Sequence, residues 1–453
     1  MALTTEWKRR FDRWRRELPN HFYVPLGSLE LSGFTTTDQL TPEQAQAGPF
    51  RPMPRGTPWG AKWEYGWFKG QVVLPEEAAG QRIALNVDVG GHSLVFIDGK
   101  AAGAKDYGHD AVTLARSGVP GTRYEVLIEA YAGHGPTPEG GGPVAYGRES
   151  VPEPGPTQRV VGDTTFGIWV EDAYQLWLDV ETLRYLCGCL DSEDLRHIDP
   201  DTLRRLLNAL DDASLRAAEI EQGLRDFTLI VDFEVPFPEM VASFRAARER
   251  LRPLLECVNG STAPVFYAVG HAHLDVAWLW PLAETERKIA RTISNQLALM
   301  EEYPDYKYIQ PQAHLYRMLS TRYPELYRRF VDAVRRGQII PEGGMWVEAD
   351  TNITGGESLI RQFIHGKRFF REEFGVESQM LWLPDVFGYS GALPQILRGC
   401  GIRYFTTAKI YWAYNGGDPF PYSTFTWEGI DGSEVLVHLL QGYGNVTHPG
   451  MRN

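Results

Sequence analysis

Two histidines and an aspartate lie close together in the stretch 269–278, which reads Val-Gly-His-Ala-His-Leu-Asp-Val-Ala-Trp. The short apolar run before it, 263–268, predicts a buried strand. Side chains two positions apart on a strand point to the same side, so His273 and Asp275 would project together from its C-terminal end. An imidazole and a carboxylate that converge suit a divalent cation, most often zinc. Because His-x-Asp is a common tripeptide, a His273 that merely caps the strand is the alternative.

Polar and aromatic side chains also follow the next four predicted strands. In chain order they are Gln310, Gln312 and His314; Trp346, Glu348 and Asp350; Asp385, Phe387 and Tyr389; and Lys409, Tyr411 and Trp412. Polar residues at strand ends also serve solubility, so no single cluster decides the matter. The reactive groups of a parallel sheet gather past the carboxyl ends of its strands. Together with the stretch 269–278, these four clusters make five, each directly after a predicted strand, and this arrangement predicts an active site at that edge of the sheet.

Asp385 is the candidate for a third metal ligand. It follows a predicted strand within Leu383–Ser390 and is flanked by aromatic residues. With His273 and Asp275 it would leave open positions on the ion for substrate oxygens. A metal-bound carboxylate stays ionised, which suits a nucleophile better than a proton donor. The alternative is that Asp385 caps a helix or forms a salt bridge.

The positions of these candidate residues depend on the strands and helices that carry them. From residue 263 onward, short apolar runs alternate with helical patterns, which predicts an α/β domain with a mainly parallel sheet or barrel over 261–453. Closely spaced strand patterns with Gly turns predict an antiparallel β-sandwich with a Gly/Pro linker over 63–165. We expect an N-terminal helix and arm over 1–62 and a helical connector over 166–260. The predicted fold class is therefore multidomain α and β.

The composition excludes several classes of protein. A formal charge of −13 argues against a nucleic-acid partner, which requires clustered Lys and Arg. Four cysteines are too few and too scattered for a disulfide scaffold. The N-terminus lacks an apolar signal segment and the chain has no long apolar run, so we expect no membrane partner and a cytoplasmic location.

The motifs resemble those of one family. Gly270–Trp278 together with Pro384–Ser390 is similar to the α-mannosidases of glycoside hydrolase family 38, and 343–350 and 424–432 also fit its cytosolic-type branch. The sandwich resembles the jelly-roll accessory domains of glycoside hydrolases. The resemblance implies a seven-stranded barrel and a retaining hydrolase of terminal α-mannosides in mannose-containing oligosaccharides.

The resemblance also implies roles for single residues. His273, Asp275 and Asp385 would bind one zinc ion, with cobalt as an alternative, and Asp385 would also be the nucleophile. Trp278 would stack beneath the sugar, and Lys409 and Trp346 would contact the substrate. A second carboxyl group about 5–5.5 Å from Asp385 would protonate the leaving oxygen.

The sequence departs from the family at its C-terminal end. Family members carry the general acid/base and a fourth zinc ligand well downstream of the nucleophile, whereas this chain ends at Asn453. We therefore expect a C-terminally truncated chain that binds metal weakly and turns over poorly. It would act as a homo-oligomer or with a complementing C-terminal chain. Four nearby candidates stay unassigned: Glu348, Asp350, His438 and His448.

Two other functions fit the same residues. A polysaccharide deacetylase-type hydrolase would use Asp385 only as a ligand and attack with a metal-bound water. A non-catalytic glycan-binding remnant would hold mannose through its aromatic residues without turnover.

Overall fold

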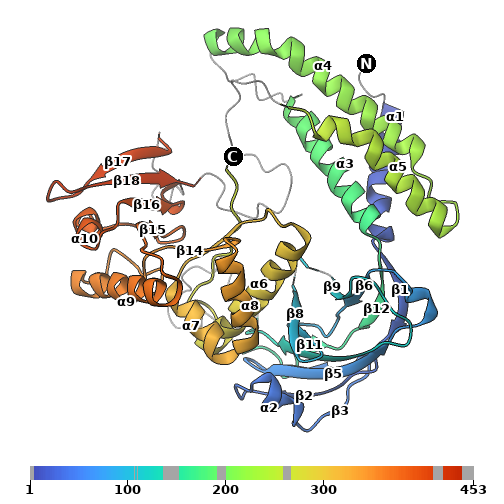
Figure 1. The fold of residues 1–453 in the computed structure, drawn as a ribbon, viewed down its shortest axis with the longest axis horizontal. Coiled ribbons are helices and arrows are strands. Elements are labelled where there is room, and N and C mark those ends of the chain that lie inside the picture. Colours follow the sequence, from blue (N-terminus) through green and yellow to red (C-terminus); the bar gives the residue numbers. More distant parts are fainter. Residues whose placement is uncertain are drawn as a thin grey trace. The chain divides into compact units, whose positions relative to one another are not determined.

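The computed structural model of the chain describes residues 5–106, 108–109, 111–135, 153–190, 200–258, 267–411 and 422–440. Contacts divide the chain into two units. The first comprises Met1–Pro25, Ile168–Phe266 and Gly444–Asn453, and the second comprises Leu26–Gly167 and Tyr267–Tyr443. Figure 1 labels the helices and strands of both units.

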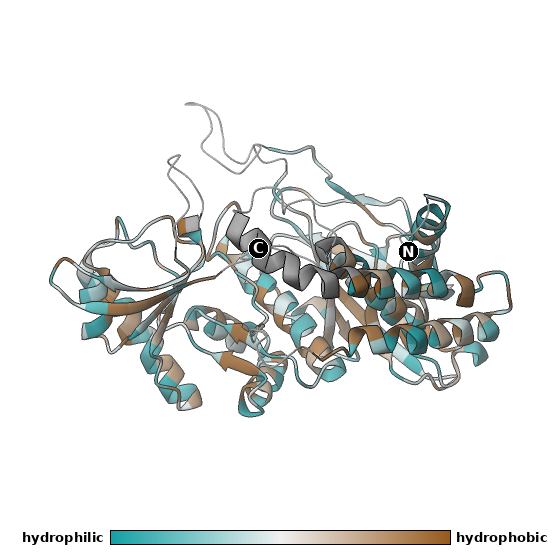
Figure 2. Ribbon diagram, turned by 90° about the horizontal axis from the view of Figure 1, so that it is seen from above, coloured by the Kyte–Doolittle hydropathy of each residue, from teal (hydrophilic) through white to brown (hydrophobic). Residues whose placement is uncertain are grey.

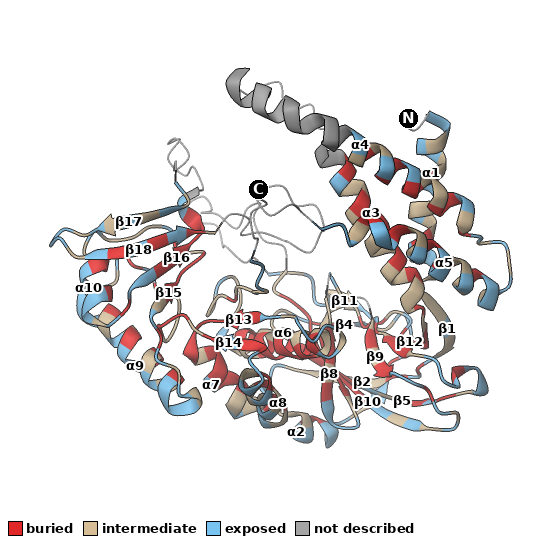
Figure 3. Ribbon diagram, turned by 45° about the horizontal axis from the view of Figure 1, so that its top comes forward, coloured by how far each residue is buried: buried red, intermediate tan, exposed pale blue. Residues whose placement is uncertain are grey.

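The first unit is helical. Its helices are α1 (Thr5–Glu17), α3 (Glu171–Leu190), α4 (Pro200–Ile230) and α5 (Phe237–Leu255), with a 3₁₀ turn, η1, at Leu18–His21. On α5 the buried residues recur at helical spacing, as at Met240, Phe244, Ala247 and Leu251. Phe11 of α1 is buried, and its ring meets Phe227 of α4 edge to face at 6.3 Å. Buried and exposed residues alternate along α1, α3 and α5 in Figure 3.

The second unit begins with two sheets of a sandwich. One has the strand order β3-β2-β5-β10-β7-β8, and the other has the order β1-β12-β6-β9. The strands of these two sheets are β1 (Tyr23–Ser28), β2 (Ser32–Thr36), β3 (Arg51–Pro52), β5 (Tyr65–Val73), β6 (Ile83–Asn86), β7 (His92–Ile97), β8 (Lys100–Lys105), β9 (Val112–Ala115), β10 (Arg123–Tyr131) and β12 (Thr165–Trp169). A separate two-stranded antiparallel sheet is formed by β4 (Pro58–Trp59) and β11 (Arg159–Val160). A short helix, α2 (Pro42–Gln46), lies between β2 and β3.

The sandwich takes strands from the segment predicted to be an arm. Strand β2 pairs antiparallel with β5, and β1 is an edge of the other sheet, although both precede residue 63. The strands before residue 63 are short and interrupted by Pro and Gly, so their alternation is too brief to mark them as strands.

The remaining strands form the parallel part of this unit. They are β13 (Tyr308–Gln310), β14 (Ile339–Pro341), β15 (Met380–Trp382), β16 (Tyr404–Thr407), β17 (Thr424–Glu428) and β18 (Glu434–Leu439). The pairs β13–β14, β15–β16 and β16–β18 are parallel, and β17 pairs antiparallel with β18. Parallel bridges join Gly270 to Tyr308 and Gly343 to Leu381, so neighbouring strands follow chain order.

The first predicted strand is only partly visible. Most of 263–268 lies outside the described residues, and Tyr267 is 90% exposed. The backbone joins the sheet at Gly270, whose amide donates to the Lys307 carbonyl at 2.8 Å. A Cβ at Gly270 would lie 1.9 Å from the Tyr306 hydroxyl oxygen, so a larger residue here would displace the Tyr306 side chain.

Helices cover the parallel strands. They are α6 (Leu282–Glu302), α7 (Ala313–Arg322), α8 (Pro324–Arg335), α9 (Gly356–Phe374) and α10 (Leu393–Gly399). Hydrophilic and hydrophobic residues alternate along the helices of the chain in Figure 2, as expected for helices with one buried face. Among the described helices, none combines the length and the apolar character that crossing a membrane requires.

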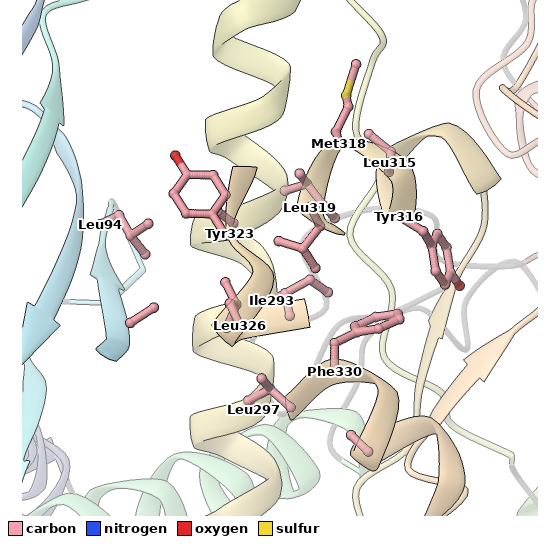
Figure 4. Close-up of a cluster of buried hydrophobic side chains, with 14 of the residues drawn as sticks. Leu94, Ile293, Leu297, Leu315, Tyr316, Met318, Leu319, Tyr323, Leu326 and Phe330 are labelled. Carbon is pink, nitrogen blue, oxygen red and sulfur yellow. The ribbon is translucent and has the colours of Figure 1, made fainter. Parts of the chain in front are cut away.

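Helix α6 joins the sandwich to the parallel strands. Figure 4 shows Leu94 of β7 in the same buried cluster as Ile293 and Leu297 of α6 and Phe330 of α8. The amide side chain of Asn295 pairs with the backbone of Ala104 on β8, at 2.7 and 3.2 Å. Because α6 follows the stretch 269–278 directly, the sandwich helps to hold that stretch in place.

A buried ionic cluster strengthens this junction. Arg287 of α6 donates to Glu129 of β10 at 2.6 Å and lies 3.9 Å above the Tyr65 ring. The Tyr323 hydroxyl donates to the other oxygen of Glu129 at 2.9 Å. Arg291 of α6 pairs in the same way with Glu284.

Candidate metal and active site

The predicted ligands on the stretch 269–278 lie just before helix α6. Residues 271–275 run as irregular backbone past the bridge at Gly270. The Thr285 hydroxyl of α6 donates to the Asp275 carbonyl at 3.1 Å, and the Trp280 indole N–H donates to the same hydroxyl at 3.0 Å. These bonds anchor the backbone of Asp275 to the first turn of the helix.

The structure brings His273, Asp275 and Asp385 together. The Nε2 atom of His273 lies 3.1 Å from Asp275 Oδ1 and 3.6 Å from Asp385 Oδ2. One potential ligand atom from each residue lies within 4.8 Å of the others. Asp385 follows β15, so the site forms where two segments about 110 residues apart meet past the ends of the parallel strands.

Glu348 is a fourth member of this cluster. Its Oε2 atom lies 3.1 Å from His273 Nδ1, and its side chain is only 5% exposed. Burial raises the pKa of the Glu348 carboxyl group, against the lowering effect of His273. The family motif implies no role for this residue. Its position after the third predicted strand was the available signal.

The carboxylates surround the imidazole of His273. Burial alone would lower the pKa of His273, but the adjacent carboxylates of Asp275 and Glu348 raise it to about 10. Without a metal ion the imidazole therefore holds a proton that balances part of the carboxylate charge. A divalent cation in the same place would satisfy the carboxylates and leave the imidazole neutral.

Lys409 lies on the other side of Asp385. Its ammonium group forms an ion pair with Asp385 Oδ1 and lies 4.4 Å from the centre of the Phe387 ring. The Lys409 side chain is buried, whereas Phe387 is 68% exposed. Lys409 thus contacts Asp385 directly, which makes it part of the site.

His271 lies next to the cluster. Its Nδ1 atom is 3.3 Å from the Ile309 carbonyl oxygen, and the Trp382 indole N–H donates to its Nε2 atom at 3.4 Å. Burial lowers the pKa of His271 to about 4, so its ring is neutral. His271, His273 and Glu348 also have ligand atoms within 4.8 Å of one another.

Gln312 links two loops of the site. Its side-chain amide donates to the Leu274 carbonyl at 2.8 Å and accepts from the Glu348 amide at 3.1 Å. Its backbone has a φ of +67°, an uncommon value for a residue other than glycine. Gln312 is buried, so the loss of either hydrogen bond would leave a polar group without a partner and without water, which destabilises the fold.

The predicted substrate-contacting aromatic residues have different environments. Trp278 is 57% exposed, and its ring meets that of Trp280 edge to face at 5.7 Å. Trp346 instead packs against His314 and Phe369, at centroid distances of 5.2 and 6.1 Å. The structure therefore gives Trp346 a packing role, and its contact with substrate stays a prediction.

The other candidates lie elsewhere or outside the described residues. The Asp350 carboxylate accepts from the amides of Asn352 and Ile353, and His438 on β18 contacts Thr424 of β17 at 2.8 Å. His448 and Trp412 lie outside the described residues.

The chemistry of the donor set fits a zinc ion. One imidazole nitrogen and two carboxylate oxygens are ligands that zinc accepts, and three protein ligands leave a coordination position open. Glu348 beside His273 is the type of outer partner that orients a metal-binding imidazole.

Comparisons with known proteins agree with this arrangement. Residues 263–450 match the glycosyl hydrolases family 38 N-terminal domain, and residues 25–140 match the alpha-mannosidase jelly roll domain. The chain is 34% identical over 415 residues to alpha-mannosidase 2C1 of Homo sapiens, which is 91% of this chain and 37% of that protein. It is 49% identical to alpha-mannosidase G of Dictyostelium discoideum over 181 residues, which is 40% of this chain and 16% of that protein. The chain therefore spans only about a third of the human protein's length.

Proposed function

Because residues 25–140 and 263–450 carry the jelly roll and N-terminal domains of α-mannosidases, this chain belongs to glycosyl hydrolase family 38, and we propose that it forms the zinc-binding part of a retaining α-mannosidase. The proposed substrates are terminal α-D-mannosides in mannose-containing oligosaccharides. The observation that carries the proposal is the meeting of His273, Asp275 and Asp385, with Lys409 paired to Asp385.

In this proposal His273, Asp275 and Asp385 hold the zinc ion. A bound zinc ion would act as a Lewis acid that binds hydroxyl groups of the sugar. Glu348 orients the His273 ring through Nδ1, which leaves Nε2 directed toward the two aspartates. Trp278, which is exposed and lies three residues after Asp275 in the chain, stacks against the apolar face of the sugar.

Asp385 is the proposed nucleophile. The ion pair with Lys409 holds one carboxylate oxygen in place. A carboxylate oxygen attacks the anomeric carbon, the bond from that carbon to the leaving oxygen breaks, and a glycosyl ester forms. The leaving oxygen takes a proton from a general acid, and water later hydrolyses the ester.

We further propose that the general acid/base and a fourth zinc ligand belong to the part of the relatives that this chain does not span. The chain corresponds to 37% of the human relative's length. Within the described residues, the carboxyl group closest to His273 besides the two aspartates is Glu348, which is already engaged with that ring.

We also infer that the parallel strands form part of the wall of a seven-stranded barrel. Successive strands that pair in parallel and in chain order, as from Gly270 through β16, support this inference. In a barrel the ends of these strands would open onto one common face, where the ligand cluster lies.

Labelling with a mechanism-based fluoro-mannoside tests the nucleophile. We expect the purified, zinc-loaded chain to carry the label on Asp385, and Asp385→Asn to remain unlabelled. The matched control is Asp350→Asn, an aspartate after the neighbouring strand that holds only a local turn; it should label like the parent. No label together with deacetylase activity would refute the proposal in favour of a metal-bound water as the attacking group.

Zinc removal tests the ligand set. Methyl α-mannoside binding, measured by calorimetry, should be lost after chelation and in His273→Ala, and restored to the parent by zinc. Mannose affinity that survives both chelation and Asp385→Ala would instead identify a glycan-binding protein without a metal site.

A further inference from the structure

The segment 383–389, which carries the proposed nucleophile, is held near both of its ends. At its start, the Leu383 amide donates to the Thr406 carbonyl of β16 at 2.9 Å. Near its end, the Gly388 carbonyl accepts from the Thr351 hydroxyl at 2.7 Å, and Thr351 is fully buried in the loop between β14 and α9. The segment is therefore bonded both to β16 and to a neighbouring loop.

Tyr389 adds a side-chain contact between this segment and the end of β16. Its hydroxyl group forms a hydrogen bond with the hydroxyl group of Thr407, the last residue of β16. Thr407 is 1% exposed, and the Tyr389 ring packs edge to face against Phe405 of the same strand at 5.0 Å. A hydrogen bond between two side chains that are held by packing fixes the position of one backbone segment against the other.

Lys409 extends from the same strand end as Thr407. It lies two residues after Thr407 in the chain, and its ammonium group forms an ion pair with Asp385 Oδ1. The other carboxylate oxygen, Oδ2, lies 3.6 Å from His273 Nε2, on the side of the proposed metal ligands. The two oxygens of Asp385 thus have different partners, and both contacts require that the segment 383–389 keep its position against β16.

We propose that Tyr389 and Thr407 are positioning residues for Asp385. Their hydroxyl pair holds the segment 383–389 against the end of β16, so that one carboxylate oxygen stays on the Lys409 ammonium group and the other faces the metal ligands. The inference rests on the proposed function, because it takes Asp385 as metal ligand and nucleophile. A displacement of the reacting group by about 1 Å can lower a rate by about 100-fold, so a contact of this kind affects the chemistry without touching the substrate.

The rate of covalent labelling tests this role on the zinc-loaded chain. The probe is a fluoro-mannosyl fluoride, from which fluoride leaves without a general acid while Asp385 forms the ester bond to the anomeric carbon. We expect Tyr389→Phe and Thr407→Val to lower the maximal labelling rate by about 10- to 100-fold. The probe concentration that gives the half-maximal rate should stay unchanged, because both variants keep the groups that bind the sugar.

Cobalt absorption gives a second readout, which requires no reaction. Cobalt(II) in place of zinc has visible absorption bands that depend on the geometry of its ligands. We expect both variants to bind one cobalt ion per chain with altered bands, because Asp385 would be oriented differently. A merely structural role would lower the stability of the chain and leave the labelling rate and the bands of the folded protein unchanged.

Two matched variants separate the hydroxyl contact from the packing around it. Thr407→Ser keeps the hydroxyl group, so it should restore the parent labelling rate and the parent cobalt bands. Tyr404→Phe removes a hydroxyl group from the same strand β16 at a residue that is 46% exposed, so it should change neither readout.

The outcomes separate the two proposals. If the parent carries the label on Asp385, parent-like labelling rates in Tyr389→Phe and Thr407→Val would overturn the positioning role, as would an equal loss in Thr407→Ser. A parent without label on Asp385 would overturn the proposed nucleophile, and the cobalt bands would then decide whether the hydroxyl pair orients Asp385 as a ligand. A parent that neither takes the label nor binds cobalt would overturn both proposals.

Discussion

Replacement of Glu129 by glutamine should destabilise the junction between the sandwich and helix α6. Glutamine keeps the shape of the side chain but removes the charge that faces Arg287. The two side chains are 2% and 1% exposed and lie 2.6 Å apart, so neither can be hydrated when its partner is lost. Removal of one partner of a buried ion pair typically costs about 3–5 kcal/mol.

The surroundings place the expected effect near the lower end of that range. Arg287 would still donate to the Ala283 carbonyl at 3.0 Å and lie above the Tyr65 ring, and both contacts offset part of the uncompensated charge. We therefore expect the free energy of unfolding to fall by about 3 kcal/mol in Glu129→Gln. Urea unfolding followed by tryptophan fluorescence measures this change.

Two further variants make the measurement specific. Glu125 lies on the same strand and is exposed, and its carboxylate accepts a hydrogen bond from the Gln71 side chain, so Glu125→Gln should change stability by less than about 1 kcal/mol. Adding Arg287→Met to Glu129→Gln removes the orphaned charge, so the double variant should be no less stable than Glu129→Gln. A loss below about 1 kcal/mol in Glu129→Gln would refute the reasoning, because the buried pair would then contribute no more than an exposed one.

Three other outcomes follow from single contacts. Gln312→Ala should lower zinc affinity by roughly 10-fold in a competition titration, because the Glu348 amide loses the hydrogen bond that positions its loop. Unchanged zinc affinity would show that Gln312 does not position the metal ligands. Gly366→Ala should lower the unfolding free energy by about 1–3 kcal/mol, since its Cβ would lie 2.4 Å from the Gly344 carbonyl oxygen; an unaltered urea midpoint would contradict this clash. His92 has a folded-state pKa of about 4 against 6.5 unfolded, so stability should fall as pH drops from 6.5 to 4, and His92→Gln should flatten this slope in unfolding titrations. An equally steep slope in the variant would assign the pH dependence to other groups.

The sequence predicted the features that depend on local patterns. The spacing of His273 and Asp275 predicted that they lie together, although residues 271–275 are irregular backbone and not the strand end on which that prediction relied. The alternation of apolar runs and helical patterns is also local, and it indicated the parallel pairing of β13–β14 and β15–β16. The family motif added Asp385, because it relates residues that are distant in the chain.

Tertiary structure decided which distant groups meet. The positions of Glu348 and Lys409 after predicted strands place both near the site, but only the structure shows that Glu348 reaches His273 Nδ1 and that Lys409 pairs with Asp385. The bond between Arg287 and Glu129 likewise joins residues 158 positions apart, on a helix and on a sandwich strand. Such contacts depend on how completed elements pack, and a charged residue is buried only where that packing supplies its partner. Residue types and spacing therefore determined the chemistry of the site, and packing decided which groups support it.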